Sequence, residues 1–391
     1  MLNIFLLGFV SFFVDISTEM VYPLIPLYLT SVFGATPVLV GIIEGIAESL
    51  ASLLKVFSGY ISDKYKKKKP IVFFGYSASL FYKLALILAS SWAGILLARI
   101  IDRFGKGIRT APRDLLVAEN AKEGKLGSSY GIHKALDMAG SALGILLAYF
   151  LMKSYNGNYA YKQIFVLSAI PAVFGLIVIL FINEKNAVKK DVQKIHLVSG
   201  FRQLDSRLKG FMLVIFLFTI GNSSNAFLLL RAQHVGYDAT TVILLYFIYN
   251  FVSSILAIPL GRLSDKIGRR HLLVSGYFSF GLVYIGFAVC TQKIAILILF
   301  VIYGLYTAMT AGVERALVAE ISPAELKGTV LGLYASISGI ALLPASIIAG
   351  LLWDHLSPAA PFWFGGITAL LSSILISIIL KNNHSKVKAN I

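Results

Sequence analysis

Apolar runs recur along this chain, and they constrain its fold more than any other feature of the sequence. Each run reaches the roughly 20 residues that a helix needs to cross a hydrocarbon layer about 30 Å thick. Of the 391 residues, 57% are hydrophobic and only 14% are charged, whereas about 25% are charged in soluble domains. Inside lipid every backbone polar group needs an internal partner, which a helix provides. The sequence therefore predicts an all-α integral membrane protein.

Polar breaks divide the apolar runs into twelve candidate transmembrane helices. We expect these spans near residues 3–31, 38–58, 70–90, 92–118, 126–152, 161–182, 209–230, 239–263, 271–291, 293–320, 326–352 and 358–380. Residues 183–208 form the longest polar stretch. The sequence therefore predicts one six-helix bundle at 1–182, a cytoplasmic linker at 183–208, and a second six-helix bundle at 209–391 that ends in a short basic tail.

The positive charge of the chain follows the connections between these spans. The chain has 35 Lys and Arg against 19 Asp and Glu. The basic residues gather in KYKKKK, in DKIGRR and in the C-terminal tail, whereas the connection SVFGATP has none. Positive charge marks the cytoplasmic side of a membrane protein. We therefore expect a multi-pass protein of the cell inner membrane with both termini in the cytoplasm, in contact with lipid headgroups and not with nucleic acid.

Two short motifs occur twice in the chain at nearly the same spacing. GYISDKYKKKK begins at Gly59 and GRLSDKIGRRH at Gly261, 202 residues later. RDLLVAE begins at Arg113 and ERALVAE at Glu314, 201 residues later. Such a spacing indicates a tandem duplication of six helices, the pattern of parallel repeats that are related by an axis along the membrane normal.

The duplicated G-x-[LI]-S-D-K pattern is similar to motif A of the major facilitator superfamily, and the likeness covers essentially the whole chain. DISTEMVYPL and GKGIRTAPRD are similar to motifs of a bacterial permease group within that superfamily. The resemblance implies two six-helix bundles related by a pseudo-two-fold axis, and a monomeric secondary transporter that works by alternating access. It also implies a cytoplasmic gate, for which we expect Gly59, Asp63, Lys64, Gly261, Arg262, Asp265, Arg269 and Arg270.

The resemblance further assigns positions to the two gate carboxylates. Asp63 is expected to approach the N-terminus of the eleventh span when the transporter is open outward, and Asp265 to approach the start of the fifth. The first motif copy departs from the family pattern because Lys66 occupies the position of a turn glycine. The second copy, GRLSDKIGRR, follows the pattern fully.

Ionisable residues concentrate in the first, second, fourth and fifth spans. A charged side chain at the bilayer centre costs about 2.5–3.5 kcal/mol on insertion scales, so these residues are expected to line a wet cavity or to pair with one another. Asp15 and Glu19 share one face of a helix. The second half offers neutral amide groups instead. The cavity candidates are Asp15, Glu19, Glu44, Arg99, Asp102, Arg103, His133, Asp137, Asn222, Asn225 and Asn250.

Two roles remain open for these side chains. Some are expected to form interhelical ion pairs, such as Asp102 with Arg99 or Arg103, and the asparagines can bridge helices. Others can carry protons, because a carboxyl group that gains and loses a proton near neutral pH suits a proton-coupled transporter. The proton-coupling candidates are Asp15, Glu19, Glu48 and Asp137.

The energy source and the chemistry point to ion-coupled transport. The chain has no G-x-x-x-x-G-K-[ST] pattern, so nucleotide-driven transport is not expected. We expect no cofactor, and the sequence contains no nucleophile–base constellation of the kind an enzyme would use. A non-transporting membrane sensor is the alternative from another class, but it would be expected to carry a sizeable soluble domain. Protons and a small solute or ion are the expected partners.

Three classes of solute remain open. The first is a small polar or ionic solute, for which Arg99, Arg103 and Lys106 offer positive charge. The second is iron, another divalent metal, or a metal–carboxylate chelate such as a siderophore, because carboxylates and imidazole suit hard metal ions; its ligands would be Asp15, Glu19, His133 and Asp137.

The third class is a drug exchanged for protons. The fifth span, GIHKALDMAGSALG, lacks the G-P-x-x-G-G core that is usual in such antiporters. Gly140 and Gly144 instead form a GxxxG pattern, which predicts close helix packing.

Overall fold

The computed structural model describes residues 2–64, 68–121, 126–155, 157–184, 206–310, 312–322 and 327–380. Within these ranges every regular element is a helix. The chain divides into two compact units. Unit 1 comprises Met1–Lys194 and Ser224–Phe247, and unit 2 comprises Ile195–Ser223 and Ile248–Ile391. Most of the predicted linker, at 185–205, and the basic tail after residue 380 lie outside the described residues.

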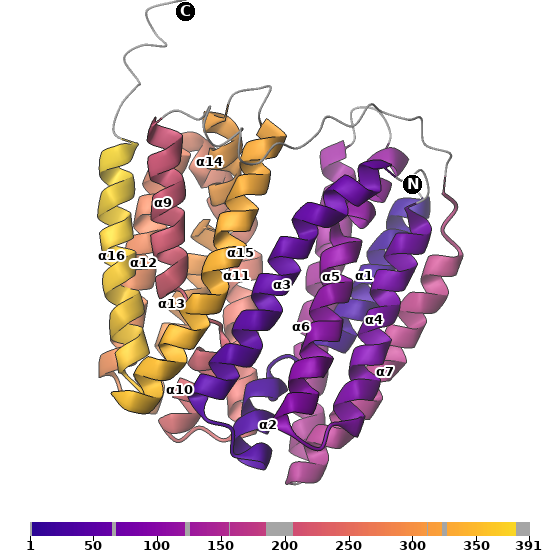
Figure 1. Cartoon of the computed structure of the whole chain (residues 1–391), viewed down its shortest axis with the longest axis horizontal. Helices are drawn as coiled ribbons and strands as arrows, with labels where there is room; N and C mark the ends of the chain where they lie inside the picture. Colours follow the sequence, from indigo (N-terminus) through magenta and orange to yellow (C-terminus); the bar gives the residue numbers. More distant parts are fainter. Residues whose placement is uncertain are drawn as a thin grey trace, which may run out of the picture. The chain divides into compact units, whose positions relative to one another are not determined.

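The helices follow the predicted spans closely (Figure 1). Those of the first half are α1 (Leu2–Glu19), α2 (Leu24–Phe33), α3 (Pro37–Lys64), α4 (Lys69–Leu88), α5 (Trp92–Asn120), α6 (Leu126–Ser154) and α7 (Asn158–Leu180). Those of the second half are α9 (Ser206–Gly221), α10 (Ala226–His234), α11 (Ala239–Ile267), α12 (Arg269–Val289), α13 (Lys293–Thr310), α14 (Val313–Ile321), α15 (Lys327–His355) and α16 (Ala360–Ile379).

Among the described residues, eleven helical segments are long and apolar enough to cross a membrane. Three of them combine two helices each, namely α1 with α2, α9 with α10, and α13 with α14. Helix α5 is not among the eleven, although its 29 residues correspond to a length of about 44 Å at 1.5 Å per residue. It carries much of the charge of the first half, including Arg99, Asp102 and Arg103.

The first and seventh predicted spans are each interrupted at the same point of the repeat. Helix α1 ends at Glu19 and α2 begins at Leu24, and α9 ends at Gly221 and α10 begins at Ala226. The end of α9 and the start of α10 each lie 202 residues after the end of α1 and the start of α2, which is also the spacing between Gly59 and Gly261. Pro23 precedes α2 directly, where its missing N–H removes a backbone hydrogen bond that a continuous helix would need. A polar segment at 222–225 separates α9 from α10.

Other helix boundaries repeat at the spacing of the second motif pair. Helices α5 and α6 begin at Trp92 and Leu126, and their counterparts α13 and α15 begin at Lys293 and Lys327. The packing partners repeat as well: α1 packs against α6 and α7, and α9 packs against α15 and α16. The inference of a tandem duplication from two short motifs therefore extends to the helices themselves.

Two glycines set the distance between α1 and α6 in unit 1. A Cβ atom on Gly140 would lie 2.3 Å from the backbone oxygen of Phe12, and one on Gly144 would lie 2.5 Å from that of Ile16. Any larger side chain would therefore force the two backbones apart. The expected packing role of this GxxxG pattern is confirmed, and its partner is α1.

We predict that Gly140→Ala lowers the stability of the protein by about 1–3 kcal/mol, the usual cost of forcing extra atoms into a close-packed contact. Gly131→Ala is a matched control in the same helix, because a Cβ atom there would meet nothing within 4 Å. The apparent melting temperature of the purified protein in detergent measures both. Equal melting temperatures for the two variants would contradict the prediction.

Candidate functional site

The close contact between α1 and α6 aligns polar residues of the two helices in pairs. Ser11 lies opposite His133, and Asp15 lies opposite Asp137. The sequence separation is the same in both pairs, and the second pair lies one helical turn beyond the first. The candidate site begins with these pairs, which the tight α1–α6 packing brings within hydrogen-bond distance.

Asp15 and Asp137, which we call the carboxyl pair, are hydrogen-bonded to each other through their side chains. An ionised carboxylate is only an acceptor, so such a bond requires that one of the two groups carries a proton. Lys134 donates a hydrogen bond from Nζ to Oδ2 of Asp137 over 2.6 Å. Asp15 is half-buried and the side chain of Asp137 is 18% exposed. The pair therefore remains partly accessible from outside the helix packing.

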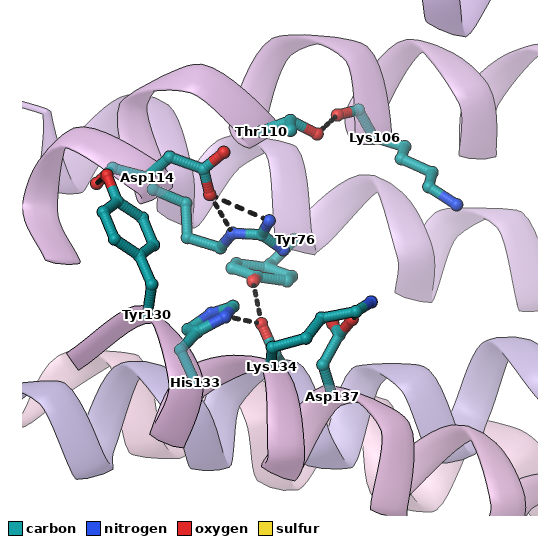
Figure 2. Close-up of polar contacts among 10 residues, drawn as sticks. Tyr76, Lys106, Thr110, Asp114, Tyr130, His133, Lys134 and Asp137 are labelled. Carbon is teal, nitrogen blue, oxygen red and sulfur yellow. Dashed lines mark hydrogen bonds and ion pairs between the residues drawn. The ribbon is translucent and has the colours of Figure 1, made fainter. Parts of the chain in front are cut away.

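A polar chain lies one helical turn from the carboxyl pair and consists of four contacts. The Ser11 hydroxyl lies 3.0 Å from His133 Nε2 and 3.0 Å from the Tyr76 hydroxyl. The Arg109 guanidinium lies over the Tyr76 ring, 4.5 Å from its centre, and donates to the backbone oxygen of Gly75 over 3.1 Å. Figure 2 shows His133, Tyr76 and Asp137 gathered between the helices. These contacts join α1, α4, α5 and α6 through polar groups.

Helices α3 and α5 are joined by what we call the ion-pair ladder, which consists of Glu44, Glu48, Arg99, Asp102 and Arg103. Arg99 Nη2 lies 2.6 Å from Glu44 Oε2, and Arg103 Nη2 lies 3.0 Å from Glu48 Oε1. Asp102 Oδ2 lies 3.8 Å from Arg99 and 3.7 Å from Arg103. All but Glu48, at 31% exposed, are at most 3% exposed. The ladder thus brings together five of the predicted residues.

Two further elements complete the surroundings of the ladder. The Tyr22 ring lies 5.3 Å from the Arg99 guanidinium and 5.6 Å from that of Arg103, a distance at which cations are attracted to the ring face. Lys83 of α4 is fully buried, lies 4.3 Å from the centre of the Tyr82 ring, and interacts electrostatically with Asp102. Three cations therefore offset three carboxylates in this part of unit 1.

Glu19 interacts electrostatically with Arg103 and Asp137 but forms no hydrogen bond or ion pair with either set among the described residues. Its Oε2 accepts a hydrogen bond from the Tyr246 hydroxyl over 3.3 Å, and Tyr246 belongs to the segment of α11 that is part of unit 1. The side chain of Glu19 is half-buried at the last residue of α1. It therefore lies at the break between α1 and α2.

The predicted metal ligands do not assemble. Among the described residues, no group of three or more His, Cys, Asp or Glu side chains is placed to hold a metal ion. Asp15 and Asp137 contact each other, whereas His133 is bound to Ser11 and Glu19 to Tyr246.

The second copy of motif A joins helices within unit 2. Arg269 forms ion pairs with Asp265, over 3.4 Å, and with Glu320 of α14. Arg270 donates to the backbone oxygen of Ser377 over 2.7 Å. Gly261 is half-buried and Arg262 is exposed. In the first copy, Gly59, Asp63 and Lys64 belong to the end of α3, but their surroundings are outside the described part. Lys66 and residues 323–326, which include the start of the eleventh span, are outside the described residues altogether.

The asparagines predicted to line the second half are divided between the two units. Asn222 donates to the Tyr306 hydroxyl over 3.2 Å in unit 2. Asn225, in unit 1, and Asn250, in unit 2, are half-buried. In unit 2 the half-buried Glu314 accepts hydrogen bonds from the hydroxyls of Tyr277 over 3.0 Å and Tyr334 over 2.7 Å.

Sequence reasoning also missed Ser11, Tyr76 and Lys134 in unit 1. Ser11 precedes Asp15 by four residues, so the shared helix face was a signal that could have identified it. Lys134 precedes Asp137 by three residues and carried the same signal. Tyr76 contacts Ser11 from a different helix, and nothing local in the sequence indicates that contact.

Comparisons with known proteins agree with this architecture. The family model of the Major Facilitator Superfamily matches residues 7–223 and again residues 210–391. An uncharacterized MFS-type transporter of Methanocaldococcus jannaschii is 38% identical over 383 residues, which are 96% of this chain and 94% of the relative. The fosmidomycin resistance protein of Escherichia coli is 26% identical over 378 residues, which are 94% of this chain and 88% of the relative.

Solved structures share the fold at low sequence identity. A nucleoside transporter superposes with a TM-score of 0.83 at 11% identity, covering 97% of this chain and 99% of its own. A D-xylose–proton symporter superposes with a TM-score of 0.73 at 16% identity, covering 95% and 96%. The chain thus shares the fold of these two proteins. The chain belongs to the Major Facilitator Superfamily, whose members are transport proteins and not enzymes, and it is a secondary transporter.

We predict that Arg99→Met destabilises the protein by about 3–5 kcal/mol, because Glu44 is left as a buried carboxylate without its partner. Adding Glu44→Leu to this variant should recover part of the loss, since apolar replacement of a buried ion pair is often tolerated. Thermal unfolding of the purified variants measures both effects.

Lys134→Gln is the control for that measurement, because the Lys134 side chain is 66% exposed and exposed ion pairs contribute little to stability. An Arg99→Met variant that unfolds at the wild-type temperature would show that the ladder does not stabilise unit 1.

Proposed function

We propose that this chain is a proton-coupled secondary transporter of the inner membrane that moves a small polar or ionic solute, with the carboxyl pair as its proton-binding site. The hydrogen bond between Asp15 and Asp137 carries the proposal. It joins α1 to α6, and the sequence neighbours of both aspartates are apolar. The bond can form only if one of the two carboxyl groups carries a proton.

Loss of that proton would convert an attraction between α1 and α6 into a repulsion. Two ionised carboxylates at hydrogen-bond distance repel each other strongly where water is scarce. Lys134 can stabilise the charge on Asp137, but Asp15 has no ion pair within 4.0 Å among the described residues. Deprotonation therefore favours separation of the two helices, which is the physical link between proton release and a change of conformation.

The break after Glu19 supports movement of this helix. Helix α1 ends four residues beyond Asp15, and α2 starts again at Leu24. A helix interrupted in the middle of a span can move its inner part without moving its outer part. His133 lies one helical turn before Asp137 on α6 and interacts with it electrostatically, and an imidazole can exchange protons near neutral pH.

We also propose that α5 crosses the membrane, which would complete the twelve predicted spans. Its support is that α5 packs against α3 and α4, both of which contain spanning segments. The predicted bundles at 1–182 and 209–391, the linker at 183–208 and the cytoplasmic termini belong to the same proposal. Labelling of single cysteines placed in the linker from one side of the membrane tests it.

Asp15→Asn is predicted to abolish solute-dependent proton movement while leaving the protein folded, because an amide cannot release the proton that the carboxyl pair shares. Proteoliposomes loaded with a pH-sensitive dye measure the proton movement when solutes from a library of organic acids, sugars, metal chelates and lipophilic cations are added. Asp137→Asn should act in the same way.

Asp238→Asn is the control for those variants, because Asp238 caps the start of α11, where it accepts hydrogen bonds from the backbone of Thr240 and Thr241 and from the Thr241 hydroxyl. If the Asp15→Asn variant shows proton movement of the wild-type size with unchanged pH dependence, the carboxyl pair is not the proton-binding site.

The two motif A copies are proposed to form the cytoplasmic gate. The support is that Asp265, Arg269 and Glu320 connect α11, α12 and α14. Arg269→Ala should therefore accelerate amide hydrogen exchange where α11 meets α12, whereas Arg262→Ala, which alters an exposed side chain, should not. Unchanged protection in Arg269→Ala would show that these ion pairs do not hold the junction.

Drug export in exchange for protons is the second candidate function. It is favoured by the name of the Escherichia coli relative, a fosmidomycin resistance protein. One feature argues against it. In the span where such antiporters usually carry a G-P-x-x-G-G core, this chain has Gly140 and Gly144, and both pack against α1. Proton movement in response to lipophilic cations, but not to organic acids or sugars, would favour this candidate over the first.

A further inference from the structure

Helix α5 presents three cations on one face. Arg99, Arg103 and Lys106 are spaced at i, i+4 and i+7, which places them in one row along a helix. The first two are held by carboxylates of α3, because Arg99 pairs with Glu44 and Arg103 pairs with Glu48. Lys106 extends the row by one further turn.

The register between α3 and α5 shows why Lys106 lacks an equivalent partner. The sequence separation between Glu44 and Arg99 is the same as that between Glu48 and Arg103. The same separation places Lys106 opposite Ala51, whose backbone oxygen lies 3.3 Å from the position of a Cβ atom on Gly107. The row of carboxylates on α3 therefore ends one turn before the row of cations on α5.

The ammonium group of Lys106 has no hydrogen bond and no ion pair within 4.0 Å among the described residues. Only its backbone oxygen is engaged, by the Thr110 hydroxyl over 2.6 Å, as Figure 2 shows. Its side chain is half-buried. The Lys106 charge nevertheless interacts electrostatically with side chains on three helices. These side chains are Asp15 and Glu19 on α1, Glu48 on α3, and Asp102 and Arg103 on α5.

We propose that Lys106 binds an anionic group of the transported solute, either a carboxylate or a phosphoryl group. A lysine ammonium is a compact charge with three hydrogen-bond donors, and the ammonium of Lys106, which interacts electrostatically with Asp15, uses none of them within the described part of the chain. Arg99 and Arg103 are almost completely buried and each is paired with a carboxylate of α3, whereas the half-buried Lys106 is not. The inference rests on the proposed function, because it names the class of solute that such a transporter would carry.

The position of Lys106 also links the anion to the proton. An anion beside Lys106 is repelled by Asp15, Glu19 and Glu48 when these are ionised. Asp15 interacts electrostatically with Lys106 and Arg109 and is hydrogen-bonded to Asp137, which in turn is paired with Lys134. A proton on the carboxyl pair removes one negative charge near Lys106, so it strengthens binding of the anion. The anion and the proton are therefore expected to move in the same direction.

The test measures ligand-induced thermal stabilisation of the purified full chain, because a ligand that binds only the folded state raises its melting temperature. The probes are two matched pairs, glycerol 3-phosphate against glycerol and succinate against succinamide, each at an acidic and a basic pH. At least one anion should raise the melting temperature more than its neutral counterpart, and more strongly at the acidic pH. The pair that responds identifies a phosphoryl or a carboxylate ligand.

Three variants separate the possible causes. Lys106→Gln should lose the anion-dependent shift, Lys106→Arg should keep it, and Asp15→Asn should keep it without its pH dependence. The proposal is overturned if neither anion stabilises the wild type more than its neutral counterpart, or if Lys106→Gln responds like the wild type. If Asp15→Asn abolishes proton movement in proteoliposomes while Lys106→Gln binds anions normally, the proposed function stands and this inference fails.

Discussion

The close packing of α1 against α6 is the constraint on which the candidate site depends. Gly140 and Gly144 let the backbone of α6 approach that of α1 so closely that a Cβ atom at either position would clash with it. At that distance, Asp15 and Asp137 form a hydrogen bond that requires a shared proton. Any movement that separates α1 from α6 must break this bond. Helix packing and protonation are thus two aspects of one contact.

The ion-pair ladder offsets the cost of burying charged side chains in the same unit. Charges that are taken out of water are costly unless geometry pairs them, and Arg99 with Glu44 achieves this at 2.6 Å with both side chains buried. The fixed register between α3 and α5 pairs two cations with carboxylates of α3 and leaves Lys106 one turn beyond the last carboxylate. A structural feature of the helix interface therefore creates a cation that is available for a ligand.

The sequence was sufficient for the helices and insufficient for most of the contacts. Apolar length defined the spans, and a repeat of two short motifs anticipated helix boundaries that recur at the same spacing in the second half. The GxxxG pattern predicted close packing, but not that α1 was the partner. Asp15 and Asp137 were singled out separately, and their contact depends on an α1–α6 register that one sequence does not encode locally. The predicted ion pairs of Asp102 with Arg99 and Arg103 are present, but the pairing of Arg99 with Glu44 and the contact of Tyr76 with Ser11 could not be predicted, for the same reason.

The central claim is that Asp15 and Asp137 share a proton, and infrared spectroscopy of the purified protein during a pH titration tests it most directly. Protonated carboxyl groups absorb separately from ionised ones, so the shared proton should give a carbonyl band that disappears as the pH rises. The account predicts that this band is absent or displaced in both Asp15→Asn and Asp137→Asn. A band that titrates identically in the wild type and in Asp15→Asn would contradict it.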